Sequence, residues 1–409
     1  MHNMPSAINT SYGFAGVSLA GDVKSRQSVE GYTLVSRLQV GIVGACGRGA
    51  SFRAACDAVE GVDITAVCDI NESELSLARA QLCATEQYTD YEEMLERSEL
   101  QAVIIGTPMH LHVPQSVAAL ERDIHVLCEV TAGVSVEECK ELVRASNASK
   151  GSYMMAENYT YTRPNQIIKE LVRQGLFGTP YYAEGEYIHE VKHMNEYETP
   201  WRRRWQTGVD GITYGSHSLG PILQWMPGDR IKRVSCEGTG VRHTDNNEKP
   251  YCQASSTMLC KTENDALIKI RVDMLSDRPH SMTNYQLQGT DGCYESARGG
   301  PGDRNKIWLR SLSNKIAWTD LDAFSSVIEL AEKYLPENWR QSGDAASLAG
   351  HGGGDYFEIV DFVGSIRSGR PPTIGIHEAM DMTLPGLISQ DSIDRDAVWL
   401  DVPNSRDWN

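Results

Sequence analysis

The sequence predicts an α/β protein in which a doubly wound parallel sheet precedes an α+β domain with a large open, mostly antiparallel sheet. Between residues 38 and 158, short apolar runs alternate with amphipathic stretches, as in a parallel sheet covered by helices on both faces. After residue 158, strand-like runs separated by Gly and Asp turns dominate, which indicates an antiparallel meander. A length of 409 residues also exceeds what one hydrophobic core usually supports. We therefore expect domains over residues 38–158 and 159–409, preceded by a polar arm at residues 1–37.

The first domain is expected to start with a strand at residues 38–43 and a glycine-rich turn. Its other predicted strands cover residues 62–68, 102–105, 124–128 and 153–156. Its helices are predicted over residues 50–59, from 73 onward, near 91–96, over 114–122 and over 136–146. Ser135 and Glu138 form a capping box at the last of these helices, because each side chain can bind a free backbone N–H of the first turn.

The second domain is expected to start with a helix over residues 165–173 that ends at Gly175. Its predicted strands cover residues 181–188, 231–236, 252–260, 266–274, 285–288 and 307–309. Two later helices are predicted over residues 356–366 and 377–387, and we expect these C-terminal helices to pack back on the first domain. The open sheet is expected to cover a substrate cleft and to pair with other copies in a homo-oligomer, a dimer or a tetramer.

The charge balance and the cysteines restrict the class of protein. Lys and Arg number 38 against 55 Asp and Glu, a net charge of −17, so nucleic acid and anionic membrane surfaces are poor candidate partners. The ten cysteines form no C-x-x-C pair, which favours a reducing compartment. No apolar run of about 18 residues and no secretion signal are present. These features are typical of a cytoplasmic enzyme.

The turn after the first strand resembles a dinucleotide fingerprint. Gly44 and Gly49 occupy the first and third glycine positions of that motif, where the strand turns and where the helix packs on the strand. Cys46 stands at the second position, which is a departure, and Gly47 beside it is expected to restore room for the phosphates. Arg48 adds a positive charge at the start of the helix.

Polar residues at the ends of later strands support a nicotinamide cofactor. Asp69 ends the second strand, where a carboxylate accepts hydrogen bonds from the ribose diol and repels a 2′-phosphate, so NAD is expected rather than NADP. Further cofactor contacts are predicted at Thr107, Pro108, His110, His112, Glu129 and Asn158. The two histidines are interpreted as a loop wall rather than as metal ligands, and no metal site is predicted. The alternative is another doubly wound domain, such as a flavodoxin-like one, with an incidental glycine turn.

From about Leu38 to the C-terminus, the chain resembles the Gfo/Idh/MocA oxidoreductase family, and more closely its offshoot, glycoside hydrolase family 109. The matching segments are residues 128–130, 134–139, 157–161, 214–221 and 350–355. The resemblance implies a tightly held NAD and a sugar-like substrate. Family dehydrogenases carry Glu-Lys-Pro, whereas this chain has Glu129-Val130-Thr131, and their Asp before the second-domain His is Thr213 here. The functional Tyr and His of the offshoot match Tyr161 and His217.

Removing a hydride from a sugar carbon requires a base for the hydroxyl proton. Without the lysine, Tyr161 and His217 are the predicted catalytic groups, and Glu129 is expected to orient the sugar or the carboxamide of the cofactor. Substrate contacts are predicted at Tyr159, His189, Trp201, Arg202, Tyr214 and His351.

Three functions remain open at this point. The first is an NAD-dependent oxidoreductase acting on a hydroxyl carbon of a sugar or glycoside. The second is a glycosidase that recycles its NAD through transient C3 oxidation, elimination, hydration and re-reduction. The third is a non-catalytic NAD(H) sensor.

Other motifs suggest chemistry that we discount. Residues 189–193 spell H-E-x-x-H, but a strand precedes them and Pro200 follows, so the zinc-binding helix of a metalloprotease is not expected. Residues 350–355 lack the Lys-Ser/Thr of a P-loop and are interpreted as a tight entry to the next helix. The basic, aromatic segment 201–205 is expected to stack on a sugar or to lie at a subunit contact.

Overall fold

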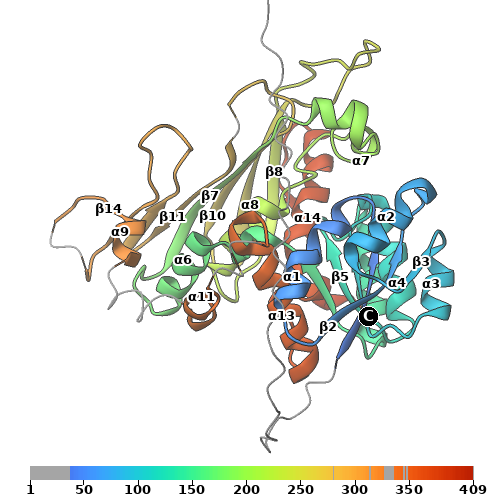
Figure 1. The fold of residues 1–409 in the computed structure, drawn as a ribbon. Helices are drawn as coiled ribbons and strands as arrows, with labels where there is room; N and C mark the ends of the chain where they lie inside the picture. Colours follow the sequence, from blue (N-terminus) through green and yellow to red (C-terminus); the bar gives the residue numbers. More distant parts are fainter. Residues whose placement is uncertain are drawn as a thin grey trace, which may run out of the picture. The chain divides into compact units, whose positions relative to one another are not determined.

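The computed structural model describes residues 37–279, 281–312, 315–326, 336–343, 346 and 349–408. The arm predicted over residues 1–37 lies outside these residues, apart from Arg37. Six parallel strands form the first sheet, which lies in the blue to teal part of the chain in Figure 1. Their order is β3-β2-β1-β4-β5-β6. They are β1 (Leu38–Val43), β2 (Val62–Cys68), β3 (Glu86–Tyr88), β4 (Ala102–Ile105), β5 (His125–Glu129) and β6 (Tyr153–Ala156).

Helices connect these strands and cover both faces of the sheet. They are η1 (Arg48–Phe52), α1 (Arg53–Ala58), α2 (Glu72–Leu82), α3 (Tyr91–Arg97), η2 (Met109–Leu111), α4 (His112–Leu120) and α5 (Val136–Ala148). Every side chain of β4 and β6 is buried, as expected for strands covered on both faces. The predicted doubly wound sheet is thereby confirmed. The prediction missed β3, because it has only three residues, which carry polar groups and none of which is buried.

The second sheet has nine strands, in the order β14-β13-β12-β11-β7-β10-β9-β8-β15. They are β7 (Pro180–Ile188), β8 (Ile231–Gly238), β9 (Ser255–Thr262), β10 (Leu267–Asp273), β11 (Ser281–Gly289), β12 (Gly292–Glu295), β13 (Lys306–Leu309), β14 (Thr319–Asp320) and β15 (Leu400–Asp401). Only β7 and β10 pair in parallel, so the predicted, mostly antiparallel sheet is confirmed. The short strands β12, β14 and β15 were not predicted.

The remaining helices of the described chain all follow β6 in the sequence. They are η3 (Asn158–Tyr161), α6 (Arg163–Arg173), η4 (Met194–Glu198), α7 (Arg202–Trp205), α8 (Ser216–Gln224), α9 (Leu321–Ser326), α11 (Glu337–Gln341), η5 (His351–Gly353), α13 (Gly354–Ser368), α14 (Ile376–Ile393) and η6 (Ser405–Asp407). Figure 1 shows α14, in red, beside β8, and α14 also contacts α5 and β6 of the first domain. None of the helices in the described part of the chain combines the length and the apolar character that a membrane crossing needs.

The H-E-x-x-H segment is not one helix. His189 follows directly after β7 and lies in no helix, and the helical turns begin only at Lys192. His193 instead lies against the ring of Tyr197. The two histidines therefore do not share a helical face, which a zincin site requires.

Candidate active site

A cleft of about 440 Å³ lies where the carboxyl ends of β1, β4 and β5 face the second sheet. In a doubly wound sheet, this edge is the usual ligand site, since β1 lies between β2 and β4 and the connections on its two sides run in opposite directions. The first domain lines the cleft with Gly44, Gly47, Arg48, Asp69, Gly106, Thr107, Pro108, Glu129, Val130 and Asn158. Across from these lie Tyr159, Tyr187, His189, Met194, Thr199, Trp201, Arg202, Tyr214, His217, Met282 and His351.

The glycine turn brings bare backbone to the cleft. Gly44 has a φ of +78°, and a Cβ there would lie 2.6 Å from the carbonyl oxygen of Gly106. A Cβ on Gly49 would lie 2.8 Å from the carbonyl oxygen of Gly44, so Gly49 serves helix-to-strand packing and does not line the cleft. Both positions thus require glycine, as a dinucleotide-binding turn does.

Asp69 is fixed at the end of β2 by two backbone groups. The N–H of Cys46 donates to its Oδ2 at 2.8 Å, and the N–H of Asn71 donates to its Oδ1 at 2.9 Å. Cys46 therefore holds Asp69 and does not itself line the cleft, contrary to the direct cofactor contact predicted for it. The bare turn and the fixed carboxylate fit a dinucleotide, whose ribose diol Asp69 would bind.

Arg48 joins the turn to two carboxylates. Its Nε donates to Glu129 at 2.6 Å, and its two terminal nitrogens donate to Asp355 at 3.1 and 3.2 Å. Asp355, the second residue of α13, also accepts from Asn158 Nδ2 at 2.9 Å and contacts His351 Nδ1 at 2.9 Å. Burial raises the pKa of the Asp355 carboxyl, but the hydrogen bonds from His351 and Arg48 outweigh it and hold that pKa well below its usual range.

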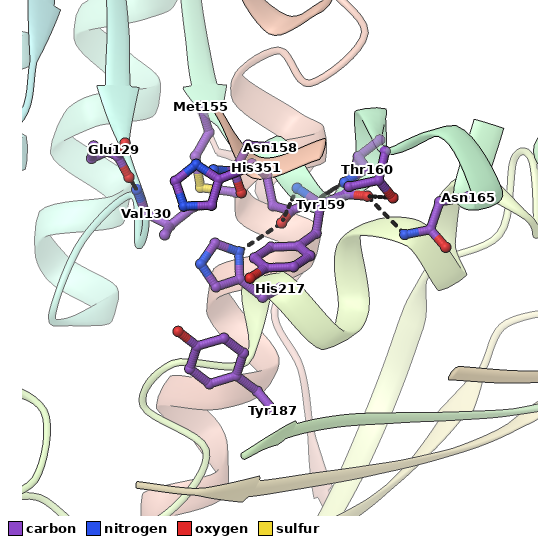
Figure 2. Close-up of polar contacts among 12 residues, drawn as sticks. Glu129, Val130, Met155, Asn158, Tyr159, Thr160, Asn165, Tyr187, His217 and His351 are labelled. Carbon is purple, nitrogen blue, oxygen red and sulfur yellow. Dashed lines mark hydrogen bonds and ion pairs between the residues drawn. The ribbon is translucent and has the colours of Figure 1, made fainter. Parts of the chain in front are cut away.

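Aromatic rings surround His217 at the other side of the cleft (Figure 2). Its ring centroid lies 4.7 Å from that of Tyr159, 5.2 Å from that of Tyr187 and 5.0 Å from that of Tyr214. The Nδ1 atom of His217 lies 2.7 Å from Oε1 of Glu157, which is fully buried. These ring faces form an apolar surface next to a proton-accepting group, an arrangement suited to a sugar.

Tyr161 does not reach the cleft. Its hydroxyl donates to Oδ2 of Asp361 at 2.9 Å, beside a separate cavity of about 130 Å³. In a 3-10 helix successive side chains are about 120° apart, so residues 159 and 161 of η3 point in different directions. Tyr159 is the tyrosine that faces His217, and the position of Tyr161 does not fit the catalytic role predicted from the sequence.

The two loop histidines also lie outside the lining of the cleft. His112 is buried, and its ring nitrogens contact the carbonyl oxygens of Thr131 at 2.7 Å and Thr107 at 2.9 Å. It therefore fastens the loops after β4 and β5 to each other rather than touching a ligand. His110 stacks on Trp205 with ring centroids 5.1 Å apart. Both differ from the cofactor contacts predicted for them.

The segment predicted to stack on a sugar forms one rim of the cleft. Trp201 and Arg202 line it, with the Arg202 guanidinium 4.6 Å from the ring centroid of Trp201. Arg202 donates to Thr199 and Gln206, which fix its side chain. His189 is held by Tyr187, whose hydroxyl lies 3.1 Å from Nδ1.

Sequence reasoning missed several residues of the site. Glu157 follows the fully buried strand β6, and an isolated acid at that point was the available signal. The pairing of Asp355 with Arg48 was not predicted, because the two residues lie 307 positions apart in the sequence. Tyr187 and Met282 lie on strands of the second sheet and carried no local signal.

Comparisons with known proteins agree with this geometry. A family model described as "Oxidoreductase family, NAD-binding Rossmann fold" matches residues 38–157, and one described as "Glycosyl hydrolase 109, C-terminal domain" matches residues 161–407. The first match covers the first sheet and its glycine turn, so this part is an NAD-binding Rossmann domain and the predicted cofactor is confirmed.

Relatives match over most of the chain. A glycosyl hydrolase family 109 protein of Saccharopolyspora erythraea is 28% identical over 430 residues, covering 98% of this chain and 90% of that protein. A protein of Shewanella oneidensis named alpha-N-acetylgalactosaminidase is 28% identical, covering 87% of this chain and 82% of that protein. Among solved structures, levoglucosan dehydrogenase in complex with NADH and levoglucosan has a TM-score of 0.75 at 17% identity, covering 90% of this chain and 100% of that one, which shows a shared fold.

Proposed function

The chain belongs to the glycosyl hydrolase 109 family, and from this premise we propose that it cleaves glycosides with an NAD that is recycled within the site. When bound, NAD supplies reversible hydride transfer. A sugar hydroxyl would be oxidised transiently, the aglycone would leave, water would add and the ketone would be reduced again. The sum of these steps is hydrolysis of the glycoside. An N-acetyl-α-galactosaminide is the first substrate to test, because one relative carries the name alpha-N-acetylgalactosaminidase. The observation that carries the proposal is the Tyr159–His217 pair facing the cofactor turn across one cleft.

The residues of this chain divide into a cofactor side and a sugar side. Gly44, Gly47, Asp69 and the Thr107–Pro108 loop would hold NAD, since they form the dinucleotide-like edge of the cleft. Val130 lines the cleft where family dehydrogenases carry lysine, so the proton of the sugar hydroxyl has to be taken by another group.

His217 is the group proposed to take that proton. It lies at the start of α8 with its ring against Tyr159, Tyr187 and Tyr214, and an imidazole accepts protons near neutral pH. Tyr159 is proposed to act as a hydrogen-bond donor instead, because burial, and next the charge of Glu157, raise the pKa of its hydroxyl well above the usual range. The tyrosine therefore keeps its proton and can offer it to a sugar or aglycone oxygen.

The second candidate function is a dehydrogenase that releases a keto sugar. The fold that this chain shares with levoglucosan dehydrogenase favours it.

One pair of assays distinguishes these functions. Purified protein would be denatured and the supernatant assayed for NAD, and the native protein would be tested with nitrophenyl glycosides in D₂O. We expect NAD to co-purify, and aglycone release without net NADH, with deuterium entering at C2 of the product. Net NADH formation would instead identify a dehydrogenase, and bound NAD without either signal would identify the non-catalytic sensor.

We further propose that copies of the chain assemble through the open face of the second sheet and that the protein acts in the cytoplasm. That face displays Leu259 and the ion pair between Glu184 and Lys269. All ten cysteines are free, which supports a reducing compartment. Light scattering on the purified chain would report its oligomeric state, and a monomer at all concentrations would contradict the first proposal.

A further inference from the structure

Glu157 carries a fully buried carboxylate that accepts several hydrogen bonds. Its Oε1 accepts from the N–H of Tyr159 at 3.3 Å and lies 2.7 Å from Nδ1 of His217. Its Oε2 accepts from the N–H of Thr160 at 2.9 Å and from the Thr160 hydroxyl. The shortest contact to Oε1 comes from His217, a side chain of a different helix, α8. The carboxylate therefore does more than cap η3.

The facing helix is shaped to admit this carboxylate. A Cβ on Gly220, one turn after His217, would lie 2.2 Å from Oε2 of Glu157. Any larger residue at this position would push the carboxylate away from His217 or separate η3 from α8. The end of β6 thus places Glu157 opposite α8, and the lack of a side chain at Gly220 leaves room for the hydrogen bond between Glu157 and His217.

We propose that Glu157 is the positioning residue of His217, holding the ring with Nδ1 protonated so that the lone pair of Nε2 faces the cleft. The inference rests on the proposed function, in which His217 takes the hydroxyl proton. In that step the substrate O–H bond breaks and an Nε2–H bond forms. The resulting imidazolium lies against a negative carboxylate that is already hydrogen-bonded to it, so no group has to move to stabilise the new charge.

The pair also holds the proton-accepting ring in place. The side chains of Glu157 and His217 are 0% and 7% exposed, and Tyr159, Tyr187 and Tyr214 surround the ring. A proton taken on Nε2 therefore lies on a ring that is fixed in place, and it can be returned to the same oxygen when the ketone is reduced. In a recycling cycle His217 takes the proton in the oxidation and supplies one in the reduction, so it ends each turnover in its starting state, whereas in a dehydrogenase it has to release the proton before the next turnover.

The substitution Glu157→Gln distinguishes positioning from simple burial. The two Thr160 groups that contact Oε2 are both hydrogen-bond donors. The side-chain oxygen of a glutamine would accept from both of them, and its NH₂ group would then face Nδ1 of His217. Nδ1 must then accept a hydrogen bond, which moves the ring proton to Nε2. The side chain remains nearly the same size, but the ring has lost its lone pair at the cleft.

The tautomer can be read by ¹⁵N NMR of the full chain labelled at its 11 histidines, with His217 assigned from the signals lost in His217→Gln. We expect wild-type His217 to carry its proton on Nδ1 and Glu157→Gln to carry it on Nε2. With glycoside substrate, Glu157→Gln should lower kcat on the order of 10²-fold and leave KM and co-purified NAD within about twofold. Tyr161→Phe is the matched control, since it alters a buried hydrogen bond on the same η3 but outside the cleft, and both readouts should match the wild type.

Gly220→Ala provides a second variant that displaces the carboxylate without removing it, and it should also lower kcat. A wild-type ring protonated on Nε2, or a folded Glu157→Gln with wild-type kcat, would overturn the inference. The tautomer is measured without turnover. A wild-type protein with the Nδ1 proton but no activity on any glycoside would therefore refute the proposed function and leave the positioning role intact.

Discussion

Replacing Arg48 by Met should lower the free energy of unfolding by about 3 kcal/mol. Removing one member of a buried ion pair costs about 3–5 kcal/mol, because the other charge is left without compensation. Arg48 holds two carboxylates, and the side chains of Glu129 and Asp355 are only 12% and 2% exposed. The lower end of the range applies here, because the Arg48 side chain is 27% exposed and Asp355 keeps the donors Asn158 and His351.

The free energy of unfolding that Arg48→Met loses should become smaller as the pH falls. With Arg48 in place, the pKa of Asp355 lies well below its unfolded value of about 3.9, so its stabilisation is present above that pH and is lost as the pH falls through the folded-state pKa. Without the guanidinium, burial is less opposed and raises that pKa in the folded variant. The variant therefore loses less of this stabilisation than the wild type on acidification, so the stability gap to wild type should narrow between about pH 5 and about pH 3.

Urea unfolding of the cofactor-free protein, followed by circular dichroism at both pH values, measures these quantities. Arg97→Met is the control, because Arg97 pairs with Glu93 on an exposed helix face and should contribute less than about 0.5 kcal/mol. A gap for Arg48→Met no larger than that of the control, or one that widens in acid, would refute the reasoning.

Two further predictions test the assignments within the cleft. Tyr159→Phe should lower kcat by roughly 10²-fold, whereas Tyr161→Phe should leave kcat within about twofold and lower the unfolding free energy by about 1.5–3 kcal/mol, since it loses a buried hydrogen bond to a carboxylate. Equal loss of activity in both variants would contradict the different orientations of the two tyrosines. Asp69→Ala should weaken NAD binding about tenfold in calorimetric titrations and narrow the preference over NADP, and an unchanged preference would show that Asp69 does not select the cofactor.

The strands of the first domain other than β3 could be predicted because their signals are local. Apolar runs of four to seven residues bounded by helical stretches identify β1, β2, β4, β5 and β6, and parallel strands place their ends at one edge. The parallel pairing of β7 with β10 could not be predicted, because nearly 80 residues separate the two strands and the pairing depends on the path of the chain between them.

The residues of the candidate site also differ in whether a local sequence signal predicts them. Asp69 and Glu129 could be predicted from their places at strand ends, whereas the choice between Tyr159 and Tyr161 depends on the direction of a single helical turn. His112 has the residue type of a ligand but lies among backbone carbonyls, and only its burial reveals that role. Glu157 acquires its role from a partner 60 positions away, which no local pattern contains.

The contact between Arg48 and Asp355 joins residues 307 positions apart and explains why the glycine run 350–354 lies at the cleft. Gly350, Gly352 and Gly353 adopt positive φ, and a Cβ on Gly354 would lie 2.4 Å from the carbonyl oxygen of Asn158. Only a glycine loop can approach the first domain this closely, and the approach brings the ring of His351 to within 6.3 Å of that of Tyr159. The same guanidinium thus fixes Glu129 and the His351 loop, which both line the cleft. A variant that moves Arg48 is therefore expected to change both the contacts proposed for the cofactor and those proposed for the sugar.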